Sequence, residues 1–308
     1  MPAGGLDFAT PVSPGGYRWW YLDALSDDGH HGLTIIAFIG SVFSPYYAWS
    51  GRKAPEDHVC LNVALYGPRA RWAMTERGHR TLDRDTDRLT IGPSALQWDG
   101  DRLTVEIDEI AVPLPRRIRG RVRLIPESLS HRPFVLDGQE RHRWWPLAPV
   151  SRIEVELDRP ALRWSGPAYL DSNAGEEALE TAFRFWTWSR AAHKEGATVA
   201  YDAQRRDGSD IFLGLDFDRR GQVREIELPP PTRLQSGLWG VRRAARCDRG
   251  DVQLMRTFED APFYTRSQLS GRLCGRQVAA VHESLDLDRF AMPLVKLMLP
   301  FRMPRRSG

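Results

Sequence analysis

The stretch HRWWP at residues 142 to 146 combines an imidazole with two indoles. Successive side chains of an extended strand point to opposite faces, so His142 and Trp144 would share one face and Trp145 would point away from both. Two roles fit His142, because a histidine in such a strand is either a proton carrier or a hydrogen-bonded structural residue. The indoles predict large apolar walls beside it.

A second stretch, GPAYLDSNAG at residues 166 to 175, places Tyr169 and Asp171 on a common face if it is extended. Its glycines, proline and asparagine predict an irregular segment that aims side chains into a cavity. The alternative is a turn in which Asp171 and Asn173 bond their own backbone. Apolar surroundings favour the protonated form of a carboxyl group, so the two stretches together suit proton transfer to an apolar substrate.

Motifs for other chemistries do not occur in the sequence. It contains no HExxH, GxGxxG, GxxxxGK[ST] or GxSxG motif, so we predict no metal, no cofactor and no α/β-hydrolase site. Glu106 and Asp108 alternate with apolar residues and are predicted to form a solvent face, not a glycosidase pair. With 43 basic and 40 acidic residues, the chain lacks the basic excess that nucleic-acid binding requires, so no nucleic-acid partner is expected.

The elements that must position these residues are predicted to be short β-strands. Three runs alternate apolar and polar residues with the period of a half-buried strand: 103–108, 152–157 and 211–218. Turn-forming pairs with glycine lie between such runs, at 99–100, 137–138, 207–208 and 220–221. Helical periodicity is confined to 176–182 and 290–301, and Pro293 and Pro300 keep any helix in the second segment short.

The length of the chain fits two domains. Regularly spaced short strands with turns between them indicate barrels or sandwiches. We predict an all-β protein with two lipocalin-like antiparallel β-barrel domains in tandem and few short helices. The boundary is placed near Pro160 to Pro167, which gives domains of residues 1–162 and 163–308. The eleven tryptophans fit either core filling or the lining of a barrel cavity.

The chain shows no sign of export or of a membrane span. Its start has neither the basic nor the apolar region of a signal peptide, and no segment reaches about 18 apolar residues. The three cysteines lack a CxxC spacing, which favours a reducing compartment. The tail from Phe290 to Arg306 mixes apolar and basic residues, which is typical of docking at a membrane surface, although core packing of the apolar run is the alternative. We expect a protein attached peripherally to the cytoplasmic side of a membrane.

Longer runs accompany these two stretches: RWWY at 18–21, IAFIGSVFSPYYAWSGR at 36–52, DHVCLNVALYGP at 57–68, WAMTERG at 72–78, IGPSALQWDGDRL at 91–103, PLPRRIRGRV at 113–122, HRWWPLAPVSRIEVEL at 142–157 and WSGPAYLDSNAGEEALE at 164–180. Together they resemble the carotenoid 1,2-hydratases (hydroxyneurosporene synthases) of phototrophic bacteria, which are related to a wider group of two-domain lipocalin-like proteins. The resemblance spans nearly the whole chain.

The resemblance implies a cofactor-independent addition of water to the terminal C1,2 double bond of an acyclic carotenoid, such as neurosporene or lycopene, which gives a tertiary alcohol. The family's catalytic positions fall on His142, Trp144, Tyr169 and Asp171. The expected roles are Asp171 as the acid, Trp144 and Tyr169 as walls for a carbocation, and His142 as the group that orients or deprotonates water. The alternative function is a non-catalytic lipocalin-like carrier of isoprenoids or lipids, which would need no acid. A carbohydrate hydrolase is disfavoured, because no carboxylate pair emerges.

Overall fold

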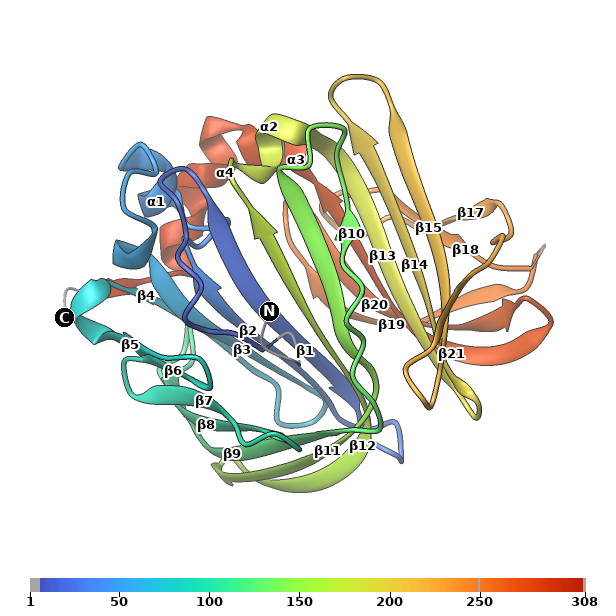
Figure 1. Ribbon diagram of the computed structural model, residues 1–308, viewed down its shortest axis with the longest axis horizontal. Helices are drawn as coiled ribbons and strands as arrows, with labels where there is room; N and C mark the ends of the chain where they lie inside the picture. Colours follow the sequence, from blue (N-terminus) through green and yellow to red (C-terminus); the bar gives the residue numbers. More distant parts are fainter. Residues whose placement is uncertain (1–5, 249, 307–308) are drawn as a thin grey trace. The chain divides into compact units, whose positions relative to one another are not determined.

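The computed structural model describes residues 6–248 and 250–306, and it confirms the all-β class. Strands make up 57% of the chain and helices 10%, and the sheets are curled in the manner of lipocalin-like proteins (Figure 1). The chain forms two compact units. Unit 1 runs up to Ala178 and resumes at Leu297, and unit 2 comprises Leu179–Lys296.

The division between the units differs from the boundary expected near residue 162. Pro160 lies in the tight turn between β11 (His142–Arg159) and β12 (Ala161–Gly175), and both of these long strands belong to unit 1. A proline in a hairpin turn resembles a proline in a linker at the level of sequence. The C-terminal residues also belong to unit 1, because β22 (Arg305–Arg306) pairs with β4 (Arg71–Arg77).

Unit 1 is built on a sheet that contains thirteen strands among the described residues. The order along the sheet is β22-β4-β3-β2-β1-β12-β11-β9-β8-β7-β6-β5, with β10 paired to β11, and every pair is antiparallel except β22 with β4. The remaining strands are β1 (Tyr17–Leu25), β2 (Gly32–Ile39), β3 (Val59–Tyr66), β5 (Leu82–Arg84), β6 (Arg88–Ile91), β7 (Ser94–Trp98), β8 (Leu103–Ile110), β9 (Arg117–Pro126) and β10 (Phe134–Val135).

Unit 2 contains a seven-stranded sheet in the order β16-β15-β14-β13-β21-β20-β19 and a two-stranded sheet of β17 and β18, again among the described residues. Its strands are β13 (Phe183–His193), β14 (Gly196–Arg205), β15 (Asp210–Asp218), β16 (Val223–Glu225), β17 (Pro231–Leu234), β18 (Arg243–Arg246), β19 (Val252–Asp260), β20 (Tyr264–Leu273) and β21 (Arg276–Asp286).

Helices are short, as predicted. They are α1 (Pro45–Trp49), α2 (Leu179–Ala182), α3 (Leu287–Ala291), α4 (Pro293–Met298) and the 3-10 turns η1 (Pro55–Asp57), η2 (His79–Thr81) and η3 (Leu299–Phe301). The helical period over 176–182 yields only the four residues of α2, and the aromatic run that follows begins β13. Pro293 starts α4, and Pro300 lies in η3, which confirms that the prolines interrupt the C-terminal helix.

The predicted alternation is seen directly in β8, where Leu103, Val105 and Ile107 are buried and Glu106 is exposed. The turn pairs also fall where they were expected: Gly100 lies between β7 and β8, and Gly208 between β14 and β15. Both glycines have positive φ, at 100° and 86°, which a side chain would disfavour. Turn chemistry therefore sets these hairpins.

The two faces of the central strands in unit 1 have different compositions. Trp20 and Leu22 of β1 and Leu170 of β12 belong to the main hydrophobic core. The alternate side chains point to the opposite face of the sheet, and these include Tyr21 of β1 and Asp171 of β12. This second face, which also carries Tyr17, Trp19, His142, Trp144 and Tyr169, is called the aromatic face below.

Candidate functional site

The structure places all four predicted site residues on the aromatic face of unit 1. In the pairing of β11 with β12, His142 lies opposite Gly175 and Trp144 lies opposite Asn173. Opposite residues share a face, so both side chains project on the same side as Tyr169 and Asp171. The same alternation sends Trp145 to the other face, where it packs against the main core, as predicted.

The segment around Asp171 is part of the continuous strand β12 and not a turn, although its pairing with β11 shifts register beside Asp171, between Trp145 and Ala148. β12 is paired on both edges, with β1 and with β11, so its backbone groups are bonded to neighbouring strands. This pairing outweighs the weak strand preference of glycine, proline and asparagine. Asp171 is consequently held at a fixed point in a central strand, with its side chain only 5% exposed.

One oxygen of the Asp171 carboxyl group accepts hydrogen bonds from two of the other predicted residues, Trp144 and Tyr169. The Trp144 indole Nε1 donates to Asp171 Oδ2 at 2.8 Å, and the Tyr169 hydroxyl donates to the same oxygen at 2.9 Å. Trp144 and Tyr169 are both completely buried. Burial, and then the charge of Asp171, raises the pKa of Tyr169 well above its usual value, so this phenol stays protonated and acts as a donor.

His142 belongs to a second group of contacts on the same face. Its Nδ1 atom lies 2.9 Å from the Tyr17 hydroxyl, and its Nε2 atom lies 3.6 Å from Glu177 Oε1. The backbone N–H of His142 donates to Asp137 Oδ1 at 2.7 Å, which fixes the strand entry. Burial lowers the pKa of His142, although Asp137 and Glu177 act in the opposite direction, so the ring is neutral near pH 7.

The Asp171 and His142 groups are separated along the sheet. His142 lies opposite Gly175, four residues after Asp171, which corresponds to about 13 Å along the strand. Alternation along each strand predicted that His142 shares a face with Trp144 and that Tyr169 shares a face with Asp171. It did not predict the distance between His142 and Asp171. The buried Trp144 and Asn173, which lie opposite each other, occupy the positions between the two groups.

Sequence reasoning missed the contribution of β1 to this face. Tyr21 lies opposite Asp171, and its ring packs edge-on against Tyr169 with a centroid distance of 6.3 Å. On the same strand, the rings of Tyr17 and Trp19 stack with a centroid distance of 4.9 Å. The signal was present in the alternation Tyr17, Trp19, Tyr21, but the pairing of β1 with β12 could not be seen from the sequence. Asp171 therefore lies among aromatic rings from three adjacent strands.

The donors present do not suggest a metal centre. Across residues 6–248 and 250–306, no three histidine, cysteine, aspartate or glutamate side chains are grouped in a way that could hold a metal ion. The aromatic face instead combines a carboxyl group, a neutral imidazole and phenol hydroxyls. This set of groups can give and accept protons beside an apolar reactant.

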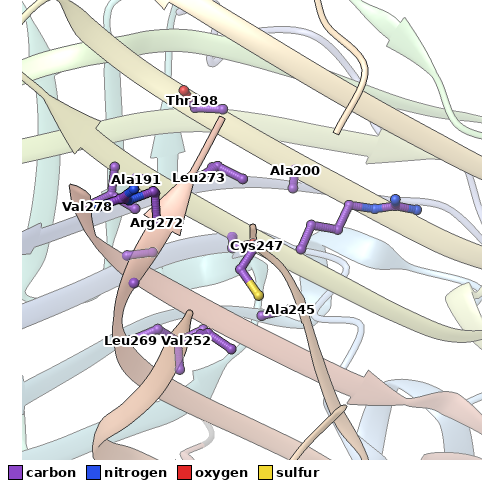
Figure 2. A pocket seen from close by; sticks show the side chains of 14 residues that line it. Ala191, Thr198, Ala200, Ala245, Cys247, Val252, Leu269, Arg272, Leu273 and Val278 are labelled. Atoms are coloured by element: carbon purple, nitrogen blue, oxygen red, sulfur yellow. The ribbon is translucent and has the colours of Figure 1, made fainter. Parts of the chain in front are cut away.

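Unit 2 contains a cavity of its own, shown in Figure 2. Its volume is about 30 Å³, and small side chains from the sheet and from β18 line much of it, including Ala191, Ala200, Ala245 and Ala280. None of the four predicted site residues lines this cavity. This volume is close to that of one water molecule, and the lining residues include no aspartate, glutamate or histidine.

Comparison with known proteins identifies the family of the chain. The family described as carotenoid hydratase CrtC matches residues 35–308. The acyclic carotenoid 1,2-hydratase of Thiocapsa roseopersicina is 55% identical over the whole chain and 77% of its own length. The enzyme of the same name from Cereibacter sphaeroides is 46% identical over 89% of the chain and 99% of its own length.

Solved structures share the fold at low sequence identity. Kievitone hydratase from Nectria haematococca has a TM-score of 0.57 at 10% identity and covers 92% of this chain and 93% of its own. A candidate AttH protein from Nitrosomonas europaea has a TM-score of 0.61 at 15% identity, over 93% of this chain and 98% of its own. These likenesses support the lipocalin-like fold, and the family match covers most of the chain. The chain belongs to the carotenoid hydratase family.

Proposed function

We propose that this protein adds water to the terminal C1,2 double bond of acyclic carotenoids such as neurosporene or lycopene, without a cofactor, to give 1-hydroxy carotenoids. The observation that carries the proposal is the buried Asp171 carboxyl group, whose Oδ2 atom accepts hydrogen bonds from Trp144 and Tyr169. Membership of the carotenoid hydratase family supports the substrate class.

The first step is proton transfer from Asp171 to C2 of the alkene. Two donors bind Oδ2, so the acidic proton lies on Oδ1. The π bond supplies the electrons for the new C2–H bond, and the positive charge forms on C1, the tertiary carbon. Burial favours the protonated acid before the step. The hydrogen bonds to Oδ2 strengthen as the carboxylate forms, so they stabilise the transition state more than the ground state.

The aromatic rings stabilise the cation, and water then captures it. A desolvated cation–π contact with Trp144 or Tyr169 is worth about 2 kcal/mol, or roughly 30-fold in rate. The oxygen of water bonds to C1, and the resulting oxonium ion loses one proton. In this mechanism, the group around His142 orients that water and removes the proton, a role commonly worth about 10² to 10⁴-fold.

The experiment that tests this function uses purified protein, detergent-dispersed lycopene or neurosporene and ¹⁸O-labelled water, with no added cofactor. We expect a product that is heavier than the substrate by one labelled water. Asp171→Asn should bind the carotenoid but form no product. Asp27→Asn, at an exposed aspartate that pairs with Arg152, is the matched control and should be fully active. Unaltered substrate that co-purifies with folded wild-type protein would instead favour the isoprenoid carrier.

The same proposal includes docking to a membrane surface from the cytoplasmic side, because the substrate resides in the bilayer. No helix in the described part of the chain is long and apolar enough to cross a membrane. Leu294 and Leu297 of α4 and Phe301 of η3 are 66%, 61% and 81% exposed, whereas Val295 and Leu299 are buried. Leu297 and Phe301, four residues apart and both in unit 1, are the apolar face of this proposal.

Basic residues follow this apolar face, since Arg302 and Arg306 are both exposed. The combination favours insertion into an anionic lipid surface. We expect Leu297→Ser combined with Phe301→Ser to reduce flotation with vesicles that contain phosphatidylglycerol. Leu238→Ser, at a leucine that is 97% exposed in unit 2, is the control and should float like wild type. Unchanged flotation of the folded double variant would contradict docking through this face.

A further inference from the structure

The imidazole of His142 has a specific partner near each ring nitrogen, and this arrangement bears on the proposed hydration. Nδ1 lies 2.9 Å from the Tyr17 hydroxyl, and Nε2 lies 3.6 Å from Glu177 Oε1. Both partners belong to unit 1. Neither Tyr17 nor Glu177 was among the residues predicted from the motifs.

The contact between Tyr17 and His142 depends on a glycine between them. Tyr17 and His142 lie on the two strands that flank β12, and both are opposite Gly175. A Cβ atom on Gly175 would lie 2.4 Å from Tyr17 Cε1 and 2.7 Å from His142 Nδ1. The missing side chain lets the two rings meet across the strand. Trp19 stacks on Tyr17 at 4.9 Å and holds its ring in place.

The protonation states follow from burial. The His142 ring is completely buried, and its lowered pKa keeps it neutral near pH 7. Between these two neutral groups the ring nitrogen is the stronger acceptor and the phenol O–H the stronger donor, so we assign the Tyr17 hydroxyl as the donor and Nδ1 as the acceptor. The remaining ring proton then lies on Nε2, on the side of Glu177. In this tautomer Nδ1 already accepts the Tyr17 hydroxyl and Nε2 already carries a proton, so a proton from water reaches the imidazole by way of the Tyr17 hydroxyl.

We propose that Tyr17 is the group that takes the proton from the water attacking C1, and that His142 and Glu177 carry it onward. The proposal rests on the proposed hydration. As the C1–O bond forms, the oxonium proton moves to the Tyr17 oxygen, and the Tyr17 proton moves to His142 Nδ1. The Nε2 proton then passes to Glu177, and exchange of the ring proton from Nδ1 to Nε2 through solvent restores the starting tautomer before the next turnover. Glu177 is partly exposed and releases one proton to solvent, and solvent returns one proton to Asp171.

The first test is Tyr17→Phe, which keeps the ring stacked on Trp19 and removes only the hydroxyl group. We expect kcat to fall by about 10² to 10³-fold with KM changed less than about twofold, as for loss of a general base. The control is Tyr47→Phe, because the Tyr47 hydroxyl is also buried and bonds a backbone carbonyl, that of Gly16, at 2.8 Å. That variant should retain wild-type kcat. A wild-type kcat for Tyr17→Phe would overturn the proposal.

The second test separates proton transfer from structure by chemical rescue. Glu177→Gln keeps the shape of the side chain, and we expect kcat to fall about tenfold and to recover as the concentration of acetate or imidazole buffer rises. Buffer should not restore Tyr17→Phe, because its defect lies next to the substrate. Glu140→Gln, at an exposed glutamate in the preceding loop, should show neither the loss nor the buffer dependence.

The two tests give a decision in every case. If Tyr17→Phe does not fold, a Glu177→Gln variant with wild-type kcat and no buffer dependence overturns the relay. If Asp171→Asn remains active, the proposed hydration mechanism fails as a whole. If Asp171→Asn is inactive while Tyr17→Phe and Glu177→Gln are normal, the relay alone fails.

Discussion

Two aspartates, the buried Asp171 of unit 1 and the half-buried Asp216 of unit 2, differ in the charge of their partners. Asp171 in unit 1 accepts hydrogen bonds from the neutral indole of Trp144 and the neutral phenol of Tyr169. Asp216 in unit 2 accepts from Thr198 Oγ1 at 2.8 Å and lies within 3.3 Å of Arg276, Arg224 and His193.

The partners decide what each carboxyl group can do. Burial acts to raise the pKa of Asp216, but the bond from Thr198 and the charges of Arg276 and His193 lower it overall. Asp216 is therefore a carboxylate that closes an ion-pair network. Asp171 is surrounded by aromatic rings, which favours a proton donor. The two carboxyl groups differ both in burial and in the charge of their partners, and on these two grounds we assign the proposed acid role to Asp171 alone.

The largest expected effect is the contrast between amide variants of these two residues. Asp171→Asn retains the shape of the side chain but has no acidic proton, so kcat should fall by about 10³-fold or more. Asp216→Asn should hydrate carotenoid at a rate within about threefold of wild type once it is folded. Product analysis by chromatography checks both variants. Equal losses of activity would remove the distinction between the two sites.

Adjacent tryptophans give a second contrast, because Trp144 and Trp145 point to opposite faces. Trp144→Phe keeps an aromatic ring but loses the N–H group that bonds Asp171. A hydrogen bond to a charged group is worth about 1.5–3 kcal/mol, so we expect kcat to fall at least tenfold. Trp145→Phe should lower the free energy of unfolding and leave kcat nearly unchanged. Similar kcat values for the two variants would contradict the assignment of faces.

The pH dependence of stability tests whether Asp216 is an ionised partner in its ion-pair network. Because the pKa of Asp216 is lower in the folded protein, its contribution is present above the unfolded pKa of about 3.9 and is lost as pH falls through the folded pKa. Asp216→Asn should destabilise the protein by about 1–3 kcal/mol at pH 6 and by less at pH 3. Urea unfolding at the two pH values measures this difference. A constant difference would show that Asp216 is not an ion-pair partner.

The smallest effect is expected in the cavity of unit 2. Ala200→Leu adds three carbon atoms to its wall. If the reaction occurs on the aromatic face of unit 1, kcat and KM should stay within about twofold, although strain can cost about 1–3 kcal/mol of stability. Steady-state kinetics with dispersed lycopene test this expectation. A large rise in KM for a folded variant would place part of the substrate in unit 2.

Local patterns in the sequence predicted the strands and the pairing of site residues within each strand. Alternation placed Trp144 on the same face as His142, because that property depends on one strand alone. The contact of Trp144 with Asp171 depends on the register between β11 and β12, and the role of Tyr17 depends on a strand far away in the chain. Such long-range pairings leave no local signal.

Glycine gave a misleading signal for the same reason. Gly166 and Gly175 suggested an irregular segment, yet both lie in β12, where other segments of the same chain approach its backbone closely. A Cβ atom on Gly166 would lie 1.9 Å from the carbonyl oxygen of Leu25. A glycine required for close approach in a sheet cannot be distinguished from a turn glycine by sequence alone.

The most direct test of the central claim, protonation of C2 by Asp171, is hydration by the wild-type protein in deuterium oxide. The account predicts a 1-hydroxy product with one non-exchangeable deuterium, located at C2 by mass fragmentation or NMR, and no such product from Asp171→Asn. Product without deuterium at C2, or labelled product from Asp171→Asn at the wild-type rate, would contradict it.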